Sequence, residues 1–276
     1  MSALVVAGGT DGIGKALAEL YLDRGDTVVV IGRAEDKGRA FLDAARERGA
    51  GERAHFVRAD LSLLAQTSRA VEEIRDLLPV VDALVLCARH YRSLRTETPE
   101  GLEENFALFY LSRYLLGHGL VESLRKADRP VVVNVAGPGA DLGLVRWDDL
   151  QLRRGYHGGA ALGQGGKLND LLGVSFAERY GVTPGIRYVL IHPGVTATSF
   201  SGVYDEATLP HIKSMQRHAK PVSAALPPIV AAIDSPPNEP LSAFVEGHRI
   251  GVDSPGFDRR AARRLEELTE QLLSGV

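Results

Sequence analysis

Short apolar runs alternate with amphipathic stretches along most of this chain. Six of these runs predict buried strands, at residues 4–7, 27–31, 54–58, 82–87, 130–135 and 186–191. Their apolarity is continuous rather than alternating, which is typical of a parallel sheet covered on both faces. Strands that alternate with helices are joined by right-handed crossovers. The pattern therefore predicts a single domain of the α/β class, built as a doubly wound parallel sheet (Rossmann type).

The segments between the runs repeat apolar residues at helical spacing. This spacing predicts a helix directly after the first strand and further helices over 35–48, 62–77, 99–126, 158–180 and 259–273, with a last strand at 243–246. The segment 99–126 is apolar on nearly every face, so we expect it to be buried in the sheet packing or at a subunit contact. Residues 201–228 are rich in proline and polar side chains and predict a mobile connection.

A glycine-rich turn joins the first strand to the first helix. Gly8, Gly12 and Gly14 fall where the backbone must turn sharply and come close to a neighbouring group. The helix that begins there points unpaired N–H groups at the turn, and such a helix start favours an anion. The segment predicts the phosphate-binding turn of a dinucleotide site, with a plain strand-to-helix turn as the alternative.

Charged residues near the next strands bear on which dinucleotide is bound. In dinucleotide-binding folds an acid at the end of the second strand binds the ribose hydroxyls, whereas an arginine suits a 2′-phosphate. Here the acid is absent and Arg33 follows the strand, which favours NADPH over NADH. Asp11, inside the turn, argues mildly against an additional phosphate. Asp60, after the third strand, is expected either to accept from the adenine amino group or to cap the next helix.

The composition excludes several other classes of function. The 276 residues carry a formal net charge of -3 with interspersed charges, so we expect neither a nucleic-acid partner nor binding to an anionic membrane. Cys87 is the single cysteine, which excludes an intramolecular disulfide. We find no leader segment and no run of membrane-spanning length, and expect a cytoplasmic protein. His192 has no second ligand at metal-binding spacing, so no metal is expected.

Four stretches, in the right order, resemble the short-chain dehydrogenase/reductase family and its retinol-dehydrogenase-like branch. AGGTDGIG at 7–14 resembles the family's TGxxxGIG, and Asp60 matches its adenine-side aspartate. HPGV at 192–195 resembles the PG motif beside the nicotinamide, and GKLND at 166–170 resembles YxxSKLAN. The resemblance implies one NADP(H)-binding domain over residues 1–276, with a lid at approximately 199–225 that closes over the substrate.

The resemblance also implies which residues bind the cofactor, NADPH or NADP+. They are Gly8, Thr10, Asp11, Gly12, Ile13, Gly14, Arg33, Asp60, Leu61, Cys87, Ala88, Arg89, Lys167, Pro193, Gly194, Val195 and Thr198. Lys167 is implied to be the family's lysine, which holds the nicotinamide ribose hydroxyls and favours an alkoxide nearby. Val195 and Thr198 are implied to contact the carboxamide.

Four departures from the family pattern fall on one side of the nicotinamide. Gly163 stands where the family has the tyrosine that donates the proton to the ketone, and Gly137 stands where it has the serine that holds the carbonyl. Phe109 replaces the asparagine of the long helix, and Arg89 replaces a glycine after the fourth strand. Only Lys167 of the catalytic set is retained.

Substitutes for the missing groups can be sought near Gly163. Tyr156 and His157 are the nearest acids, although Tyr156 is more consistent with packing of its loop. The glycines near the site are expected to open a slot for a rigid substrate, with helix entry and packing as the alternative. These glycines are Gly137, Gly158, Gly159, Gly163, Gly165 and Gly166.

The departures leave two classes of function open. AGPG and GQGGKLND resemble the corresponding segments of atypical angucyclinone ketoreductases of antibiotic biosynthesis, which also lack the serine and the tyrosine. That resemblance implies NADPH-dependent reduction of a ketone on an aromatic polyketide, with alcohol oxidation by NADP+ as the reverse use of the same site. The alternative is a catalytically silent NADPH-binding sensor or scaffold. Both a monomer and a homodimer are compatible with the sequence.

Overall fold

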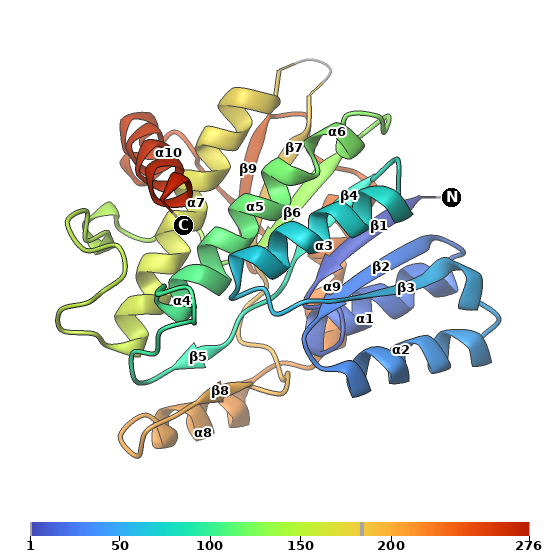
Figure 1. Ribbon diagram of the computed structural model, residues 1–276, viewed down its shortest axis with the longest axis horizontal. Coiled ribbons are helices and arrows are strands. Elements are labelled where there is room, and N and C mark those ends of the chain that lie inside the picture. The colour runs from blue at the N-terminus through green and yellow to red at the C-terminus, as the bar shows by residue number, and fades with distance from the viewer. Residues whose placement is uncertain (1, 183–184, 276) are drawn as a thin grey trace.

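The computed structural model describes residues 2–182 and 185–275, with an eight-stranded sheet at its centre (Figure 1). The strands lie in the order β10-β9-β7-β6-β4-β1-β2-β3. Their bounds are β1 (Ala3–Ala7), β2 (Thr27–Gly32), β3 (Ala54–Arg58), β4 (Ala83–Leu86), β6 (Val131–Val135), β7 (Arg187–His192), β9 (Leu241–Val245) and β10 (His248–Ile250). Neighbouring strands pair in parallel except β9 and β10. The predicted doubly wound parallel sheet is confirmed.

Helices cover both faces of this sheet (Figure 1). Their bounds are α1 (Gly12–Asp23), α2 (Glu35–Glu47), α3 (Leu64–Leu77), α4 (Glu104–Phe106), α5 (Ser112–Gly119), α6 (Val121–Leu124), α7 (Gly158–Tyr180), α8 (Leu209–His218), α9 (Val222–Asp234) and α10 (Arg259–Ser274). Successive strand residues point to opposite faces. In β1, Val5 packs into the core of α3, α5 and α7, whereas Leu4 and Val6 pack into the core of α1, α2 and α9. This two-sided burial explains the continuous apolar runs.

The long helix predicted over 99–126 is wrong in its extent. α4 begins only after Glu103, whose carboxylate accepts hydrogen bonds from the N–H groups of Asn105 and Phe106. Such a side chain satisfies the first free N–H groups of a helix and so fixes its start. Residues 107–111 then form a π-helical turn, and the chain is interrupted again at Leu120, between α5 and α6. The predicted burial of the segment is confirmed for residues 106–111.

The mobile connection predicted over 201–228 is instead mostly regular structure. β8 (Gly202–Val203) pairs in parallel with β5 (Tyr91–Arg92), and α8 and the first half of α9 follow. Pro227 and Pro228 lie inside α9, although proline lacks the N–H that a helix interior needs. The prolines misled the prediction because α9 buries Ile229 and other apolar side chains against the sheet, and this burial outweighs the lost hydrogen bonds.

An aromatic cluster on α5 and α7 holds a buried histidine. The His118 ring lies 4.2 Å from the Tyr114 ring centroid and 5.5 Å from those of Phe176 and Tyr180. Its Nδ1 is 3.2 Å from the Tyr180 hydroxyl, and its Nε2 is buried without a partner in the described part of the chain. Burial lowers the pKa of His118 to about 4. The unfolded chain therefore binds a proton here between about pH 6.5 and pH 4 that the folded chain does not.

Replacing this histidine by phenylalanine is expected to remove an acid sensitivity. When the pH falls from 7.5 to 5.0, the wild type should lose about 2 kcal/mol more unfolding free energy than His118→Phe, because only the wild type must keep an imidazole neutral. Urea unfolding at the two pH values measures this difference. His248→Phe, at an exposed strand position, is the matched control and should follow the wild type. Identical pH dependence of wild type and His118→Phe would contradict the assignment.

Candidate functional site

A cleft of about 490 Å³ lies at the carboxyl ends of the parallel strands. Residues that follow β1, β2, β3, β4, β6 and β7 line it, as does Met215 of α8. β1 lies between β4 and β2, so the strand order reverses there. In open α/β sheets, ligands bind outside the carboxyl ends of the strands at such a point. The cleft therefore occupies the position that the sheet topology favours for a ligand.

The glycines of the first turn are required by close approaches of the backbone. Gly8 has φ +77°, and a Cβ there would lie 2.8 Å from the backbone nitrogen of Ala88. A Cβ on Gly14 would lie 2.4 Å from the Gly8 carbonyl oxygen, and one on Gly12 would lie 2.7 Å from Thr198 Cγ2. Asp11 caps α1 by accepting from the Gly12 N–H. The turn thus brings bare backbone N–H groups at the start of α1 to the floor of the cleft.

Positive side chains gather where β2 ends. Arg33 and Lys37 both line the cleft, and Lys37 Nζ lies 2.5 Å from Asp11 Oδ2. Burial opposes ionisation of Asp11, but hydrogen bonds from Lys37 and Ser199 outweigh it and lower the pKa of that carboxyl. The pairing offsets the charge that made Asp11 unfavourable for an additional phosphate. Sequence reasoning missed Lys37, although its place in the first turn of the helix after Arg33 was a usable signal.

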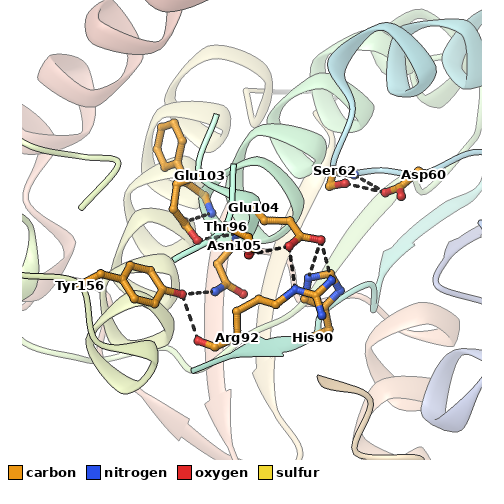
Figure 2. A network of polar contacts seen from close by, with 10 residues as sticks. Asp60, Ser62, His90, Arg92, Thr96, Glu103, Glu104, Asn105 and Tyr156 are labelled. Carbon is orange, nitrogen blue, oxygen red and sulfur yellow. Dashed lines mark hydrogen bonds and ion pairs between the residues drawn. The ribbon is translucent and has the colours of Figure 1, made fainter. Parts of the chain in front are cut away.

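Asp60 lines the cleft next to this positive group, and it also shapes its own loop (Figure 2). Its Oδ1 accepts hydrogen bonds from the Ser62 hydroxyl at 2.6 Å and the Ser62 N–H at 3.0 Å. It does not cap α3, which begins at Leu64. Of the two roles expected for Asp60, the structure therefore excludes the helix cap.

The cleft brings together the cofactor residues named from the sequence, with the exception of Lys167. The Lys167 side chain is fully buried, with Nζ 2.7 Å from Asp170 Oδ2 and 2.8 Å from the Gly256 carbonyl oxygen. Asp170 also accepts from the Gly139 N–H at 3.0 Å, and burial raises its pKa to about 6. Asp170 lies one helical turn after Lys167, on the same face of α7. A role in ribose binding would require Lys167 to leave this pair.

The six glycines expected to open a slot do not share one role. A Cβ on Gly158 would lie 2.3 Å from the Arg92 carbonyl oxygen, and one on Gly165 would lie 2.6 Å from Phe109 Cδ1. At these two positions the open-slot expectation is wrong, because close packing requires glycine. At Gly137 and Gly163 a Cβ would meet only side-chain atoms at 3.9 and 3.5 Å, which are ordinary contacts. These two positions would accept a Cβ without a clash, although none of the six glycines lines the cleft itself.

A polar network absent from the sequence analysis adjoins the cleft (Figure 2). His90 lines the cleft, and its Nε2 is 3.6 Å from Glu104 Oε1. Glu104 accepts two hydrogen bonds of 2.6 Å from Arg92 and one of 2.8 Å from Thr96. Burial lowers the pKa of His90 to about 4, and the Arg92 hydrogen bonds lower that of Glu104 to about 2. The network anchors the loop after β4; its residues lie outside any motif, so no sequence signal pointed to it.

The candidate substitute acids lie outside the cleft. The Tyr156 hydroxyl accepts from Asn105 Nδ2 at 2.7 Å and donates to the Arg92 carbonyl oxygen at 3.1 Å, so it packs its loop (Figure 2). His157 is exposed and does not line the cleft. Cys87 does line it, but burial raises the pKa of its thiol to about 12, so it is not a nucleophile. Tyr156 and His157 are therefore not placed to protonate a ligand in the cleft.

A family model described as short chain dehydrogenase matches residues 2–147, more than half of the chain. The chain belongs to the short-chain dehydrogenase family. Retinol dehydrogenase 12 of Mus musculus is 27% identical over 283 residues, which cover 98% of this chain and 85% of that protein.

Two further relatives of this short-chain dehydrogenase match over a smaller part. "Putative daunorubicin C-13 ketoreductase DnrU" of Streptomyces sp. (strain C5) is 29% identical over 196 residues, covering 71% of this chain and 66% of that protein. Polyprenol dehydrogenase of Homo sapiens is 26% identical over 200 residues, covering 70% of this chain and 60% of that protein. These alignments span less than two thirds of the relatives' own length.

Solved structures agree with the short-chain dehydrogenase fold. NADPH-bound carbonyl reductase from chicken fatty liver has a TM-score of 0.67 at 15% identity and covers 91% of this chain and 99% of that chain. A short chain dehydrogenase from Burkholderia cenocepacia in complex with NADP has a TM-score of 0.67 at 16% identity, covering 92% and 98%. Within residues 2–182 and 185–275, no helix is long and apolar enough to cross a membrane, and no three His, Cys, Asp or Glu side chains could together hold a metal ion.

Proposed function

We propose that this short-chain dehydrogenase binds NADPH in the cleft and reduces a ketone on a flat aromatic substrate to a secondary alcohol. The observation that carries the proposal is the cleft at the strand-order reversal, with a glycine turn at its floor and Arg33 and Lys37 at one end. Relatives solved with NADP or NADPH share the fold. The small-molecule substrate would enter from the side of α8 and the segment after β7.

The residues of the cleft fit a dinucleotide phosphate. The start of α1 offers N–H groups, and the contacts of Gly8 and Gly14 leave no room for side chains that would cover them. Arg33 forms no ion pair within residues 2–182 and 185–275, so its guanidinium is available for a 2′-phosphate. Lys37 would add a second cation, and Asp60 would face the adenine. The segment 193–198 would hold the carboxamide.

The remaining half of the site must stabilise charge on the ketone oxygen. NADPH, when bound, supplies the hydride that forms the new C–H bond at the carbonyl carbon. The oxygen then becomes an alkoxide and needs a proton, and Gly137 and Gly163 provide no donor. We propose that a phenol beside the ketone stabilises the alkoxide and that this phenol or water supplies the proton. A positioned general acid contributes about 10² to 10⁴ in rate, whereas orientation contributes up to ~7 to 11 kcal/mol, so loss of the tyrosine is tolerable.

The substrate class is proposed from size and surroundings. Gly137 directly follows the cleft residues Val135 and Ala136, and the absence of a side chain there leaves less bulk for a rigid ring system to avoid. Leu144, beside Gly163, and Val195, in the cleft, are 43% and 40% exposed, so apolar surface is available to it. One relative, DnrU, is named as a putative daunorubicin C-13 ketoreductase. Together with the resemblance of AGPG and GQGGKLND to atypical angucyclinone ketoreductases, these features favour a ketone of an aromatic polyketide.

The test is NADPH oxidation by the purified protein. We expect turnover with an angucyclinone whose ketone is flanked by a phenol, and much slower turnover with the same ring lacking the phenol or with cyclohexanone. Gly163→Tyr is the informative variant, because a Cβ at 163 meets only Leu144 at 3.5 Å and the protein should fold. It should extend activity to ketones without the phenol. Equal rates of NADPH oxidation by the wild type with cyclohexanone and with the phenolic ketone would contradict the proposed mechanism.

A catalytically silent NADPH-binding protein is the second candidate. The observation that favours it is the pairing of Lys167 with Asp170, outside the cleft. Tight NADPH binding without turnover of any aromatic ketone, combined with activity gained by Gly163→Tyr, would support this candidate over the reductase.

A further inference from the structure

Arg89 is a second cleft arginine without an internal partner. It follows β4, lines the cleft, and is exposed. Among the described residues it forms no ion pair and donates no hydrogen bond, whereas Lys37, at the other end of the cleft, and Arg92, three residues along the chain, are paired with carboxylates. Glycine is usual at this position in the family that the sequence resembles. The guanidinium therefore needs an explanation from the site itself.

The arginine rests on an aromatic ring that the fold holds rigidly. Arg89 Cζ lies 5.6 Å from the centroid of the Phe109 ring, and Arg113 Cζ lies 4.5 Å from the same centroid. Phe109 is only 2% exposed and belongs to the π-helical turn before α5. Two cations over one ring gain cation–π attraction, which restricts where each guanidinium lies. The contact with the Phe109 ring therefore restricts the position of the Arg89 guanidinium.

Phe109 in turn depends on a glycine of α7. Its Cδ1 lies 2.6 Å from where a Cβ of Gly165 would be, so any side chain at 165 would displace the ring. The Phe109 carbonyl oxygen accepts from Asn169 Nδ2 at 2.7 Å, which fixes the backbone of the turn to α7. The replacements at 89 and 109 therefore form one structural unit with Gly165, in which the glycine leaves room for the ring and the ring supports the guanidinium.

The position of Arg89 in the sheet separates it from the phosphate end. In the sheet, β2 and β4 lie on opposite sides of β1. Arg33 follows β2, and Arg89 follows β4. A dinucleotide bound across such a reversal places its two nucleotides on opposite sides of it. Since Arg33 marks the side of the 2′-phosphate, Arg89 lies on the side of the reaction, together with Ala136 and His192.

We propose that Arg89 binds the paired oxygens of the substrate, the ketone oxygen and the hydroxyl oxygen beside it. This inference rests on the proposed function and names the feature of the substrate that the site recognises. A guanidinium presents parallel N–H donors in one plane, which match two neighbouring oxygens of a planar ring system. Its charge would stabilise negative charge on either oxygen, a role for which Gly137 supplies no side-chain donor.

Ligand binding tests this role without depending on turnover. The probes are 1-hydroxyanthraquinone, which carries the hydroxyl beside a ketone, and anthraquinone, which lacks it. With the protein saturated by NADP+, the wild type should bind the hydroxyl compound about tenfold more tightly. Arg89→Met keeps contact with Phe109 but removes the donors, so it should lose that preference. Arg153→Met, at an exposed loop position, is the matched control.

The affinity for NADP+ provides the discriminating measurement. Arg89→Met should weaken binding of 1-hydroxyanthraquinone by a larger factor than binding of NADP+, to which the family resemblance also assigns this residue. Arg89→Lys, which keeps the charge but not the planar fork, should recover only part of the hydroxyl preference. In Arg89→Gly, added guanidinium ion at millimolar concentration should restore binding of 1-hydroxyanthraquinone.

Three results would overturn the inference. These are equal affinities of the wild type for the two quinones, no affinity for either, or a loss of NADP+ affinity in Arg89→Met as large as the loss for the quinone. The proposed function fails separately. A wild type that prefers the hydroxyl compound through Arg89 but oxidises no NADPH would disprove the reductase and leave the binding role standing.

Discussion

Replacing Lys167 with methionine should lower the free energy of unfolding by about 3 to 5 kcal/mol at pH 8. The change leaves the fully buried Asp170 without its partner, and an uncompensated buried carboxylate is costly. The deficit should shrink as the pH falls through 6, because Asp170, whose pKa rises further without the lysine, then takes up a proton. Urea unfolding at pH 8 and pH 5 measures both effects.

Matched variants separate the ion pair from mere truncation. Lys167→Met/Asp170→Leu should recover most of the lost stability, since replacing both members of a buried pair by apolar groups is often neutral. Lys126→Met removes an exposed lysine and should cost less than about 0.5 kcal/mol. The NADPH Kd of the folded Lys167→Met protein is the second readout. Unchanged stability with a large loss of NADPH affinity would contradict the buried arrangement and support the ribose-binding role that the family resemblance implies.

Replacing Arg33 with alanine should weaken NADPH binding by about 10- to 100-fold and leave NADH binding nearly unchanged. The reason is that a charge-assisted hydrogen bond contributes about 1.5 to 3 kcal/mol, and only NADPH carries the 2′-phosphate. The affinities for both cofactors can be compared by the quenching of intrinsic protein fluorescence. Arg39→Ala, on the exposed face of α2, is the control and should bind both as the wild type does. Equal losses for NADPH and NADH would show that Arg33 does not select the cofactor.

Much of the fold follows from local patterns in the sequence. The strand at 54–58 and the helix at 158–180 coincide with β3 and α7. α9 was missed because Pro227 and Pro228 signal a break, while the apolar surface that stabilises the helix is supplied by the sheet. Local patterns do not reveal such tertiary compensation.

In the candidate site, too, features set by local sequence were predictable and features set by tertiary contacts were not. The glycine turn, Arg33 and Asp60 were predictable, since each follows a predicted strand and parallel strands end at one edge of the sheet. The packing of Phe109 against Gly165 was not, because the two residues come from separate segments and nothing in either segment indicates that they meet. The orientation of Lys167 was not predictable either. It depends on Asp170 and on a carbonyl of the distant Gly256.

The short pairing of β5 with β8 links the mouth of the cleft to the arginine inside it. Tyr91 and Tyr204 stack across this pairing with ring centroids 5.4 Å apart, and Arg89 lies two residues before Tyr91. Any outward swing of the chain between β8 and α8 must therefore either break this ladder or pull the loop after β4 along with it. In the second case, the movement that admits a substrate also moves Arg89. The guanidinium then reaches its position in the cleft only when the segment between β8 and α8 closes.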